Sequence, residues 1–290
     1  MEGSRGLGDV YKRQMFNRGH ELTVDTYSDR PMTNQFQGNM ADICPVGAIT
    51  EKEFRFKRRV WKLKKTPSIC VGCSTGCNVT IEYDKNEVFR LKPRDNPDVN
   101  KWWMCDQGRL TYKDLNIREN RVVHPLGKTA EGFQEISWEN AFSAIQEKIS
   151  ELQPTSNEVI GLVDTHASNE ELYLFKKLLK EGFDSDQLFF PDLEWEQPVS
   201  DFFINSLITS DKSPNRAGAR MLGLKGAKSS EEVSSKIPTG TKVLLVFGKP
   251  FEDENLFSQA GNISLVINIA AWKSGWSETA DVTLPGRLHS

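Results

Sequence analysis

Four cysteines carry the clearest chemical signal in this sequence. Their spacing is Cys70-x2-Cys73-x3-Cys77-x27-Cys105, and the first three share one short loop in which a glycine stands directly before two of them. Glycine lets a backbone fold closely around a compact object and aim N–H groups at sulfide and thiolate. Four thiolates around a cube are the usual ligands of a [4Fe–4S] cluster. The sequence therefore predicts one [4Fe–4S] cluster on these residues, with electron transfer as its chemistry.

Zinc is the main alternative for the same four thiolates. Structural zinc sites of four cysteines usually use two Cys-x2-Cys pairs, and Cys105 has no such partner in the sequence. The flanking Trp102, Trp103 and Met104 are large and apolar, and we expect them to shield a cluster from water. A zinc-stabilised scaffold without redox function, and cysteines that are unligated or disulfide-bonded, stay open as alternatives.

The fifth cysteine, Cys44, stands apart in the stretch 43–50 (ICPVGAIT). A Cys-Pro pair typically supplies the remote ligand of a ferredoxin-like cluster, after a group of three closely spaced cysteines. No such group precedes Cys44 in this sequence. The residues alone therefore predict a buried cysteine that holds no cluster.

The composition is that of an ordinary soluble globular protein. The chain has 290 residues, 38% of them hydrophobic and 27% charged, with a formal net charge of -3. This balance argues against a nucleic-acid partner or an anionic membrane surface. The basic stretch 55–65 is expected to be a solvated strand edge or a docking surface. There is no apolar run long enough to span a membrane and no secretory signal, so metal ligation is favoured over disulfides.

The chain divides into segments by cysteine content. Residues 15–65 hold Cys44, residues 66–121 hold the other four cysteines, and residues 122–290 hold none. Residues 1–14 show neither a core nor a targeting pattern and are similar to a translated sequencing adapter, so we exclude them from fold reasoning. We expect a gene fragment that is cut at both ends.

The middle segment predicts a small β-rich module. Residues 78–83 (NVTIEY) and 87–91 (EVFRL) read as strands, and the turn-forming residues 84–86 lie between them. This pattern predicts an antiparallel hairpin. The hairpin would hold the three-cysteine loop against the segment that supplies Cys105.

The last segment predicts alternating strands and helices. The apolar runs 159–163, 243–247 and 265–269 are typical of buried strands in a mostly parallel sheet with both faces covered. The predicted fold class is thus α/β, with a small β-rich 4Fe-4S module followed by an incomplete α/β domain that resembles molybdopterin oxidoreductases.

Two amphipathic helices are expected in this segment. One covers residues 138–152, with Ser137 as its N-cap, and the other follows a capping box that begins at Ser168. The positions expected to face the core are Ala141, Phe142, Ile145, Ile149 and Leu152 of the first helix, and Leu172, Phe175, Leu178 and Leu179 of the second.

Several stretches resemble the large iron–sulfur subunit of bacterial NADH:quinone oxidoreductase, respiratory complex I. Residues 38–50 (GNMADICPVGAIT) are similar to the block that closes a ferredoxin-like cluster in that family. The four spaced cysteines match a cluster motif shared with molybdopterin oxidoreductases, and residues 105–109 (CDQGR) fit the pattern of this large iron–sulfur subunit. Residues 214–218 (PNRAG) and 280–285 (ADVTLP) resemble landmarks of its large domain.

The resemblance implies a domain organisation. Residues 15–65 would be the C-terminal remnant of a ferredoxin-like (His/Cys 4Fe-4S) domain, 66–121 a 4Fe-4S Mo/W bis-MGD-type domain, and 122–290 a truncated molybdopterin oxidoreductase-like domain. Cys44 would then be the orphaned last ligand of a second [4Fe–4S] cluster, with its other ligands upstream of residue 15. Only the full-length protein would hold both clusters.

The resemblance also implies a function. The chain would be an iron–sulfur electron-carrier subunit of an NADH dehydrogenase (quinone), with no catalytic residue and no catalysis of its own. Its partners would be other peripheral-arm subunits, and it would lie on the cytoplasmic face of the inner (plasma) membrane without spanning it. The four-cysteine cluster would sit off the main chain of clusters, where a structural role is the alternative to electron transfer.

The rival interpretation is the catalytic subunit of an NAD-linked formate dehydrogenase or a related molybdopterin oxidoreductase. Active members of that class resemble this chain at the cluster motif, but they usually carry lysine where this sequence has Gln107. They also need a Cys, selenocysteine or Ser to ligate the metal, and no cysteine follows Cys105. Ser168 lies in a plausible region, but its capping box explains it better. No molybdopterin is therefore expected.

Overall fold

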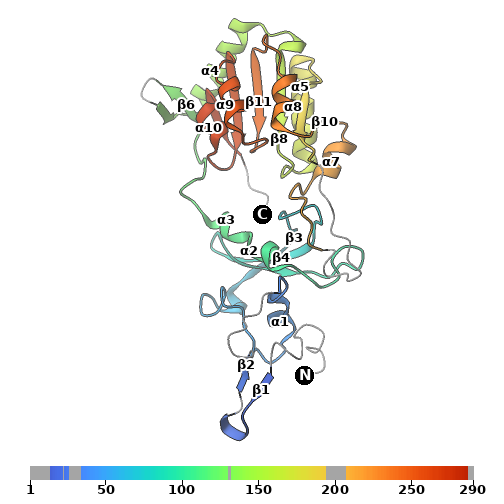
Figure 1. Ribbon diagram of the computed structural model, residues 1–290. Helices are drawn as coiled ribbons and strands as arrows, with labels where there is room; N and C mark the ends of the chain where they lie inside the picture. The colour runs from blue at the N-terminus through green and yellow to red at the C-terminus, as the bar shows by residue number, and fades with distance from the viewer. Residues whose placement is uncertain (1–13, 22, 26–33, 130–131, 194–206, 287–290) are drawn as a thin grey trace. The chain divides into compact units, whose positions relative to one another are not determined.

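The computed structural model describes residues 14–21, 23–25, 34–129, 132–193 and 207–286 (Figure 1). The described chain forms two compact units. The first, here called the cysteine unit, comprises the described residues up to 116 together with 207–209. The second, the α/β unit, comprises 117–193 and 210–286. The expected adapter-like tail lies outside the described residues except for its last residue.

The cysteine unit is built on an antiparallel sheet with the strand order β3-β4-β5. Its strands are β3 (Lys64–Ile69), β4 (Asn78–Asp84) and β5 (Glu87–Pro93). The predicted hairpin is confirmed, because β4 and β5 pair antiparallel around Lys85 and Asn86. Both turn residues have positive φ, 50° and 64°, as a type I′ hairpin turn requires. The sequence did not predict β3, whose charged residues are mostly exposed.

Short helices surround this sheet. They are α1 (Gly38–Ile43), α2 (Asp106–Leu110), α3 (Tyr112–Asn116) and the 3-10 turns η2 (Gly19–Glu21) and η3 (Val60–Lys62). A separate pair of strands, β1 (Gln14–Phe16) and β2 (Thr23–Asp25), runs antiparallel. The hydrophobic core combines apolar side chains such as Val79, Ile81 and Met104 with three of the cysteines. The cysteine loops are therefore part of the core of this unit.

The α/β unit contains the predicted parallel sheet. Its strand order is β10-β9-β8-β11-β12-β13-β6-β7. The strands are β6 (Leu126–Thr129), β7 (Gly132–Glu135), β8 (Val159–Val163), β9 (Leu188–Pro191), β10 (Lys225–Ala227), β11 (Val243–Phe247), β12 (Leu265–Ala270) and β13 (Val282–Pro285). The strands from β10 to β13 are parallel, whereas β6 and β7 add an antiparallel edge.

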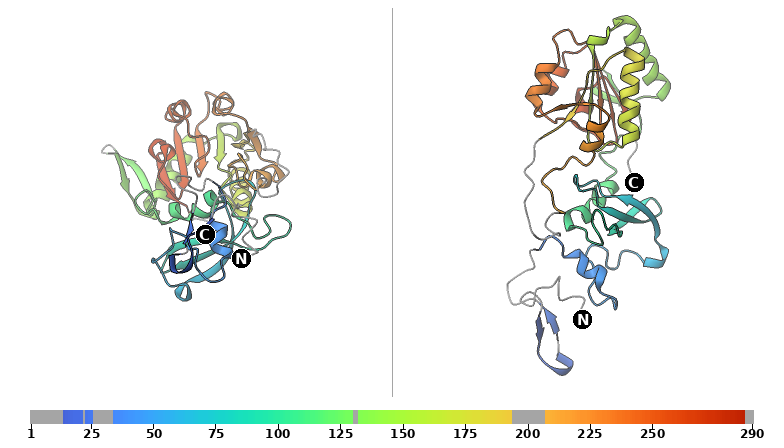
Figure 2. Two further views of the ribbon diagram at one scale, coloured as in Figure 1. Left: turned by 60° about the horizontal axis from the view of Figure 1, so that its bottom comes forward. Right: turned by 90° about the vertical axis from the view of Figure 1, so that its right-hand side faces the viewer.

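Helices cover both faces of this sheet, as Figure 2 shows from the side. They are α4 (Trp138–Leu152), α5 (Asn169–Phe183), α7 (Arg216–Met221), α8 (Ser230–Lys236), α9 (Glu254–Ala260), α10 (Gly275–Thr279) and the 3-10 turn η4 (Ser156–Glu158). Residues of α4, α5 and α7 enter one core cluster and residues of α8, α9 and α10 the other. The prediction of a sheet that is buried on both faces is thus confirmed.

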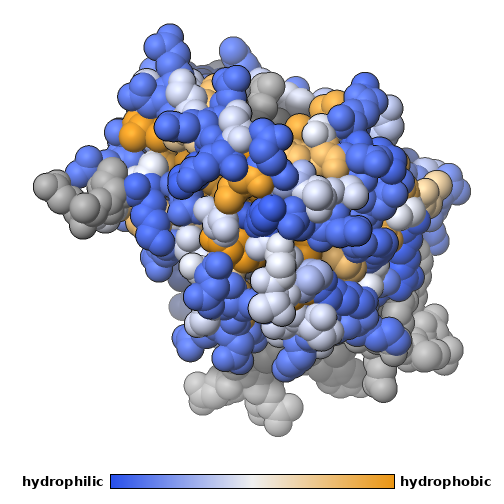
Figure 3. All heavy atoms as spheres, turned by 90° about the horizontal axis from the view of Figure 1, so that it is seen from above, coloured by the Kyte–Doolittle hydropathy of each residue, from blue (hydrophilic) through white to orange (hydrophobic). Residues whose placement is uncertain are grey.

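Two of the predicted core positions are wrong. Phe142 of α4 is 55% exposed and stacks on Trp138, with ring centroids 5.6 Å apart. Leu178 of α5 is 46% exposed. Both lie next to a truly buried residue, Ala141 and Leu179, because helical spacing gives a wider apolar arc than these helices bury. Over the surface in Figure 3, hydrophobic residues form separate patches among hydrophilic ones.

Candidate iron–sulfur site

The loop from Cys70 to Cys77 connects β3 to β4. Its ends are tied because the backbone N–H of Cys70 donates to the carbonyl of Cys77 at 2.8 Å. Gly76 has a φ of +63°, which is the left-handed conformation that glycine adopts without strain. The predicted need for glycine beside Cys77 is thus met at the turn itself. The loop curls so that Cys70, Cys73 and Cys77 are all buried.

Cys105 reaches the same place from the other end of the unit. It is the N-cap of α2, and its Sγ accepts a hydrogen bond from the N–H of Gly108 at 3.2 Å. A Cβ at Gly108 would lie 3.0 Å from the Sγ of Cys70 and 3.3 Å from the Sγ of Cys105. The two sulfurs therefore share the surface of one glycine, and any side chain there would fill the space between them.

The four thiols also share one electrostatic environment. Burial raises the pKa of Cys77 to about 12, and Cys70, Cys73 and Cys105 raise it further as nearby like charges. Four buried thiolates are unstable together unless a strongly cationic group lies among them. Thiolates are the ligands of iron–sulfur clusters and of zinc, so the donor set fits a bound metal group. None of the five cysteines forms a disulfide.

Within the described part of the chain, no group of three or more His, Cys, Asp or Glu side chains is arranged to hold a metal ion. Zinc holds its thiolates at about 2.3 Å in a tight tetrahedron. A cube of four irons is larger than one ion, so the thiolates that hold it lie further apart than zinc ligands do.

The apolar shield that we expected beside Cys105 is only partly formed. Met104 is fully buried and Trp103 packs against the same core, but Trp102 is 60% exposed and shields nothing. The segment is held instead by Asn100, a buried side chain that the sequence analysis did not single out. Its Oδ1 accepts from the N–H of Asn78 at 2.9 Å, and its Nδ2 donates to the carbonyl of Trp103 at 3.0 Å.

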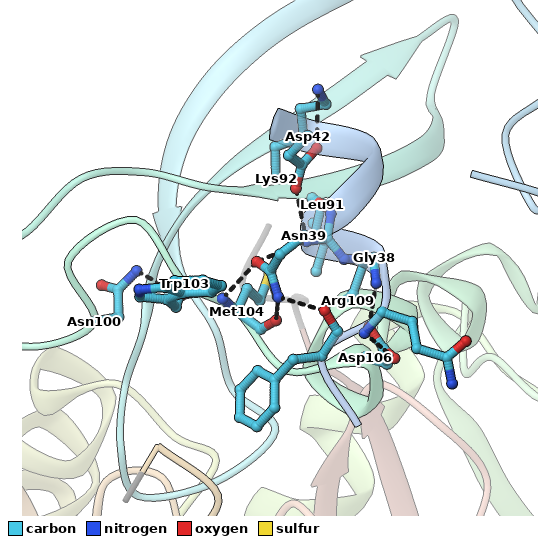
Figure 4. Close-up of polar contacts among 12 residues, drawn as sticks. Gly38, Asn39, Asp42, Leu91, Lys92, Asn100, Trp103, Met104, Asp106 and Arg109 are labelled. Atoms are coloured by element: carbon cyan, nitrogen blue, oxygen red, sulfur yellow. Dashed lines mark hydrogen bonds and ion pairs between the residues drawn. The ribbon is translucent and has the colours of Figure 1, made fainter. Parts of the chain in front are cut away.

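A second polar side chain, Asn39 of α1, clamps the residue that precedes Cys105 (Figure 4). Its Oδ1 accepts from the N–H of Met104 at 3.1 Å, and its Nδ2 donates to the Met104 carbonyl at 2.7 Å. On the other side of Cys105, the carboxylate of Asp106 accepts from the N–H groups of Gln37 and Gly38 at 2.9 and 2.8 Å. These contacts hold the Cys105 segment against the start of α1.

Arg109 completes this set of contacts from within the core. Its side chain is only 2% exposed, and its Nη2 lies 2.7 Å from Oδ2 of Asp42. The same Nη2 donates to Oδ1 of Asn39 at 3.3 Å, and Lys92 pairs with the other carboxylate oxygen of Asp42 at 3.1 Å. No sequence periodicity signals a buried arginine. The only hint was its place in the stretch 105–109.

Cys44 lies at the C-cap of α1, outside the buried set of four. It is partly exposed, so our expectation of a buried residue is wrong. Its Sγ accepts the N–H of Ile49 at 3.4 Å. This N–H and those of the neighbouring loop residues lower the pKa of Cys44 against the opposing effect of desolvation. The loop thus favours a thiolate, which is the form that binds iron.

The α/β unit offers no comparable set of ligands among its described residues. Ser168 caps α5, because its hydroxyl accepts from the N–H of Glu171 and Glu171 in turn accepts from the Ser168 N–H. The predicted capping box is thus confirmed. Asp164, just past β8, pairs with His166 at 2.9 Å. The hydrogen bond to Asp164 raises the pKa of His166.

Three family models match consecutive parts of the chain. Residues 4–50 match the ferredoxin-like domain of NADH-quinone oxidoreductase subunit 3. Residues 63–113 match the NADH-ubiquinone oxidoreductase NDSU1/NuoG-like 4Fe-4S domain, and residues 121–190 match the molybdopterin oxidoreductase model. The first match includes Cys44, and the second includes all four spaced cysteines.

Curated relatives agree with these models. The NADH-ubiquinone oxidoreductase 75 kDa subunit of Reclinomonas americana is 36% identical over 56% of this chain and 23% of its own length. The corresponding NADH-quinone oxidoreductase subunit of Rickettsia prowazekii is 35% identical over 57% of this chain and 24% of its own length. The alignments thus span about a quarter of the length of these relatives.

Among solved structures, acetylene hydratase from Pelobacter acetylenicus matches with a TM-score of 0.35 and 15% identity, covering 70% of this chain and 29% of that one. No helix among the described residues is both long and apolar enough to cross a membrane. The domain order and the curated relatives together show that the chain is related to the large iron–sulfur (75 kDa) subunits of NADH-quinone oxidoreductases.

Proposed function

We propose that this chain carries an iron–sulfur electron carrier of an NADH:quinone oxidoreductase, with its cluster on Cys70, Cys73, Cys77 and Cys105. The observation that carries the proposal is the gathering of four buried thiols around the bare backbone of Gly108. The match of residues 63–113 to a 4Fe-4S domain supports it independently.

The residues of the site have distinct roles in this proposal. When bound, a [4Fe–4S] cluster supplies one-electron transfer. The four cysteines would hold it as thiolates, and the N–H of Gly108 would donate to the Cys105 sulfur and so favour the reduced, more negative state. Met104 and the apolar core around the loop would exclude water on one side, which also tunes the reduction potential.

The surroundings of the protein belong to the same proposal. Its partners would be other peripheral-arm subunits of the complex, and it would lie peripherally on the cytoplasmic face of the inner membrane. Cys44 would be a ligand of a second [4Fe–4S] cluster in the full-length protein, so this chain would hold a single cluster. No molybdopterin would be bound, because Gln107 replaces the usual lysine and no cysteine follows Cys105.

A pair of cysteine substitutions tests the proposal on the full chain. Cys73→Ser should lose or convert the cluster, whereas the matched change Cys44→Ser should leave the iron content unaltered. Both variants are reconstituted anaerobically and titrated with dithionite while the absorption of the cluster is followed. Unchanged iron in Cys73→Ser would refute the ligand assignment, and lost iron in Cys44→Ser would show that Cys44 is a ligand in this chain after all.

A further inference from the structure

The polar contacts around Arg109 connect two cysteine segments that are far apart in the sequence. The Arg109 network, as we call it, consists of Gly38, Asn39 and Asp42 of α1 with Asp106 and Arg109 of α2 (Figure 4). At one end, Asp106 directly follows the cluster ligand Cys105. At the other end, α1 runs straight into Cys44, which is its C-cap.

The network contacts α1 along most of its length. The carboxylate of Asp106 binds the N–H groups at the start of the helix, and Asn39 clamps the backbone of Met104. Asp42, one turn further toward Cys44, pairs with Arg109. Because α1 has only six residues, its own hydrogen bonds are too few to keep it helical alone. Its geometry therefore depends on these contacts with the Cys105 segment.

Arg109 is the least replaceable member of the network. A buried guanidinium needs its counter-charge, and a carboxylate binds it in a fixed direction. The packing is also closed, because a Cβ at Gly38 would lie 2.3 Å from Nε of Arg109. Any movement of α2 is thus transmitted to α1 by a charged pair and by direct contact.

We propose that Arg109 is a positioning residue that couples the four-cysteine site to the Cys44 loop. A cluster on Cys105 fixes the start of α2, and the Arg109 network passes that order through α1 to Cys44. The two iron–sulfur sites expected in the full-length protein are then held in one geometry. This inference rests on the proposed function for its cluster, but the network itself does not.

Hydrogen exchange of the full chain tests the coupling. In the natural chain, anaerobic loading with iron and sulfide should slow amide exchange in α1 by about tenfold or more, as a charge-assisted contact predicts. In Arg109→Met the response of α1 to loading should disappear, and Arg109→Lys should restore part of it. Lys113→Met is the matched control, because Lys113 forms a half-exposed ion pair with Glu53 in the same unit.

This comparison separates coupling from simple stability. A residue that only stabilises the fold would speed α1 exchange equally with and without the cluster and would leave the difference between the two states intact. A coupling residue removes the difference. The reduced cluster of Arg109→Met should also show an altered electron paramagnetic resonance spectrum, while that of Lys113→Met should not.

Milder variants cover the case in which Arg109→Met does not fold. Asp42→Asn keeps the shape of the side chain and removes the counter-charge, and Gly38→Ala pushes on the guanidinium. Each should lose the response of α1, unlike Gly240→Ala, where an added Cβ meets nothing within 4 Å. The coupling is refuted if the folded variants take up full iron and α1 still responds as in the natural chain.

The two proposals fail in different ways. If the natural chain binds no cluster, the proposed function fails, and faster α1 exchange in the cluster-free variants than in the cluster-free natural chain would still support the positioning role. If the cluster forms and α1 exchange is the same in all variants, the positioning role fails and the proposed function stands.

Discussion

Gly108 sets the room available between two of the proposed ligands. Its missing side chain leaves a gap bounded by the sulfurs of Cys70 and Cys105, each within 3.3 Å of where a Cβ would be. The glycine also lies in α2, where alanine is normally more favourable by about 1 kcal/mol. A glycine at this position is thus explained by the site and not by the helix.

Gly108→Ala should therefore separate cluster binding from stability. The added methyl group would occupy the space between the sulfurs, so we expect reconstituted iron to fall well below that of the natural chain while the cluster-free chain stays folded. Iron analysis and circular dichroism of the two proteins measure this. Gly240→Ala, in open space, serves as the control, and full iron in Gly108→Ala would contradict the geometry of the site.

The buried thiol of Cys77 predicts a pH dependence for the cluster-free chain. Burial raises its pKa from 9.0 to about 12 in the folded state, so the unfolded chain loses this proton first. Folding stability is then fully present below pH 9.0 and falls as the pH rises from 9.0 toward 12.

Denaturant unfolding at a series of pH values between 8 and about 11 measures this effect. Cys77→Ser should flatten the decline in the free energy of unfolding, because serine does not titrate there. Cys44→Ser should not flatten it, since the pKa of Cys44 is lowered instead. An equal slope in all three proteins would show that the Cys77 thiol is not held in its neutral form.

At the scale of elements, helix caps and turns were the features best predicted from sequence. The N-caps Ser137 and Ser168 and the hairpin turn at Lys85 and Asn86 all occur as expected. Each depends on a few neighbouring residues whose hydrogen bonds are local. By contrast, α1 was not predicted, because the carboxylate that binds its first N–H groups is Asp106, 68 residues away from Gly38.

The cap of α5 gives a prediction at this scale. Ser168→Ala removes the hydroxyl that accepts from Glu171, so we expect the free energy of unfolding to fall by about 1 kcal/mol. Thermal or denaturant unfolding measures it. The variant should keep its iron, since Ser168 caps a helix in this account; a loss of metal would revive its rival role as a ligand.

Over the whole molecule, chemistry and scaffold belong to different units. All five cysteines lie in the cysteine unit, while the parallel sheet and its covering helices form the α/β unit. The cysteine spacing was enough to predict the four ligands, because ligand identity is written in residue types. The supporting side chains Asn39, Asn100 and Arg109 were missed, because a buried polar residue looks like a surface residue until its partners are known.

The metal content of the whole chain tests the central claim most directly. The chain is reconstituted anaerobically, its iron, zinc and sulfide are measured, and an electron paramagnetic resonance spectrum is recorded after reduction with dithionite. The account predicts about four irons and four sulfides per chain, with the signal of a reduced [4Fe–4S] cluster. One zinc per chain, with no sulfide and no signal, would contradict it and would make the four cysteines a structural site.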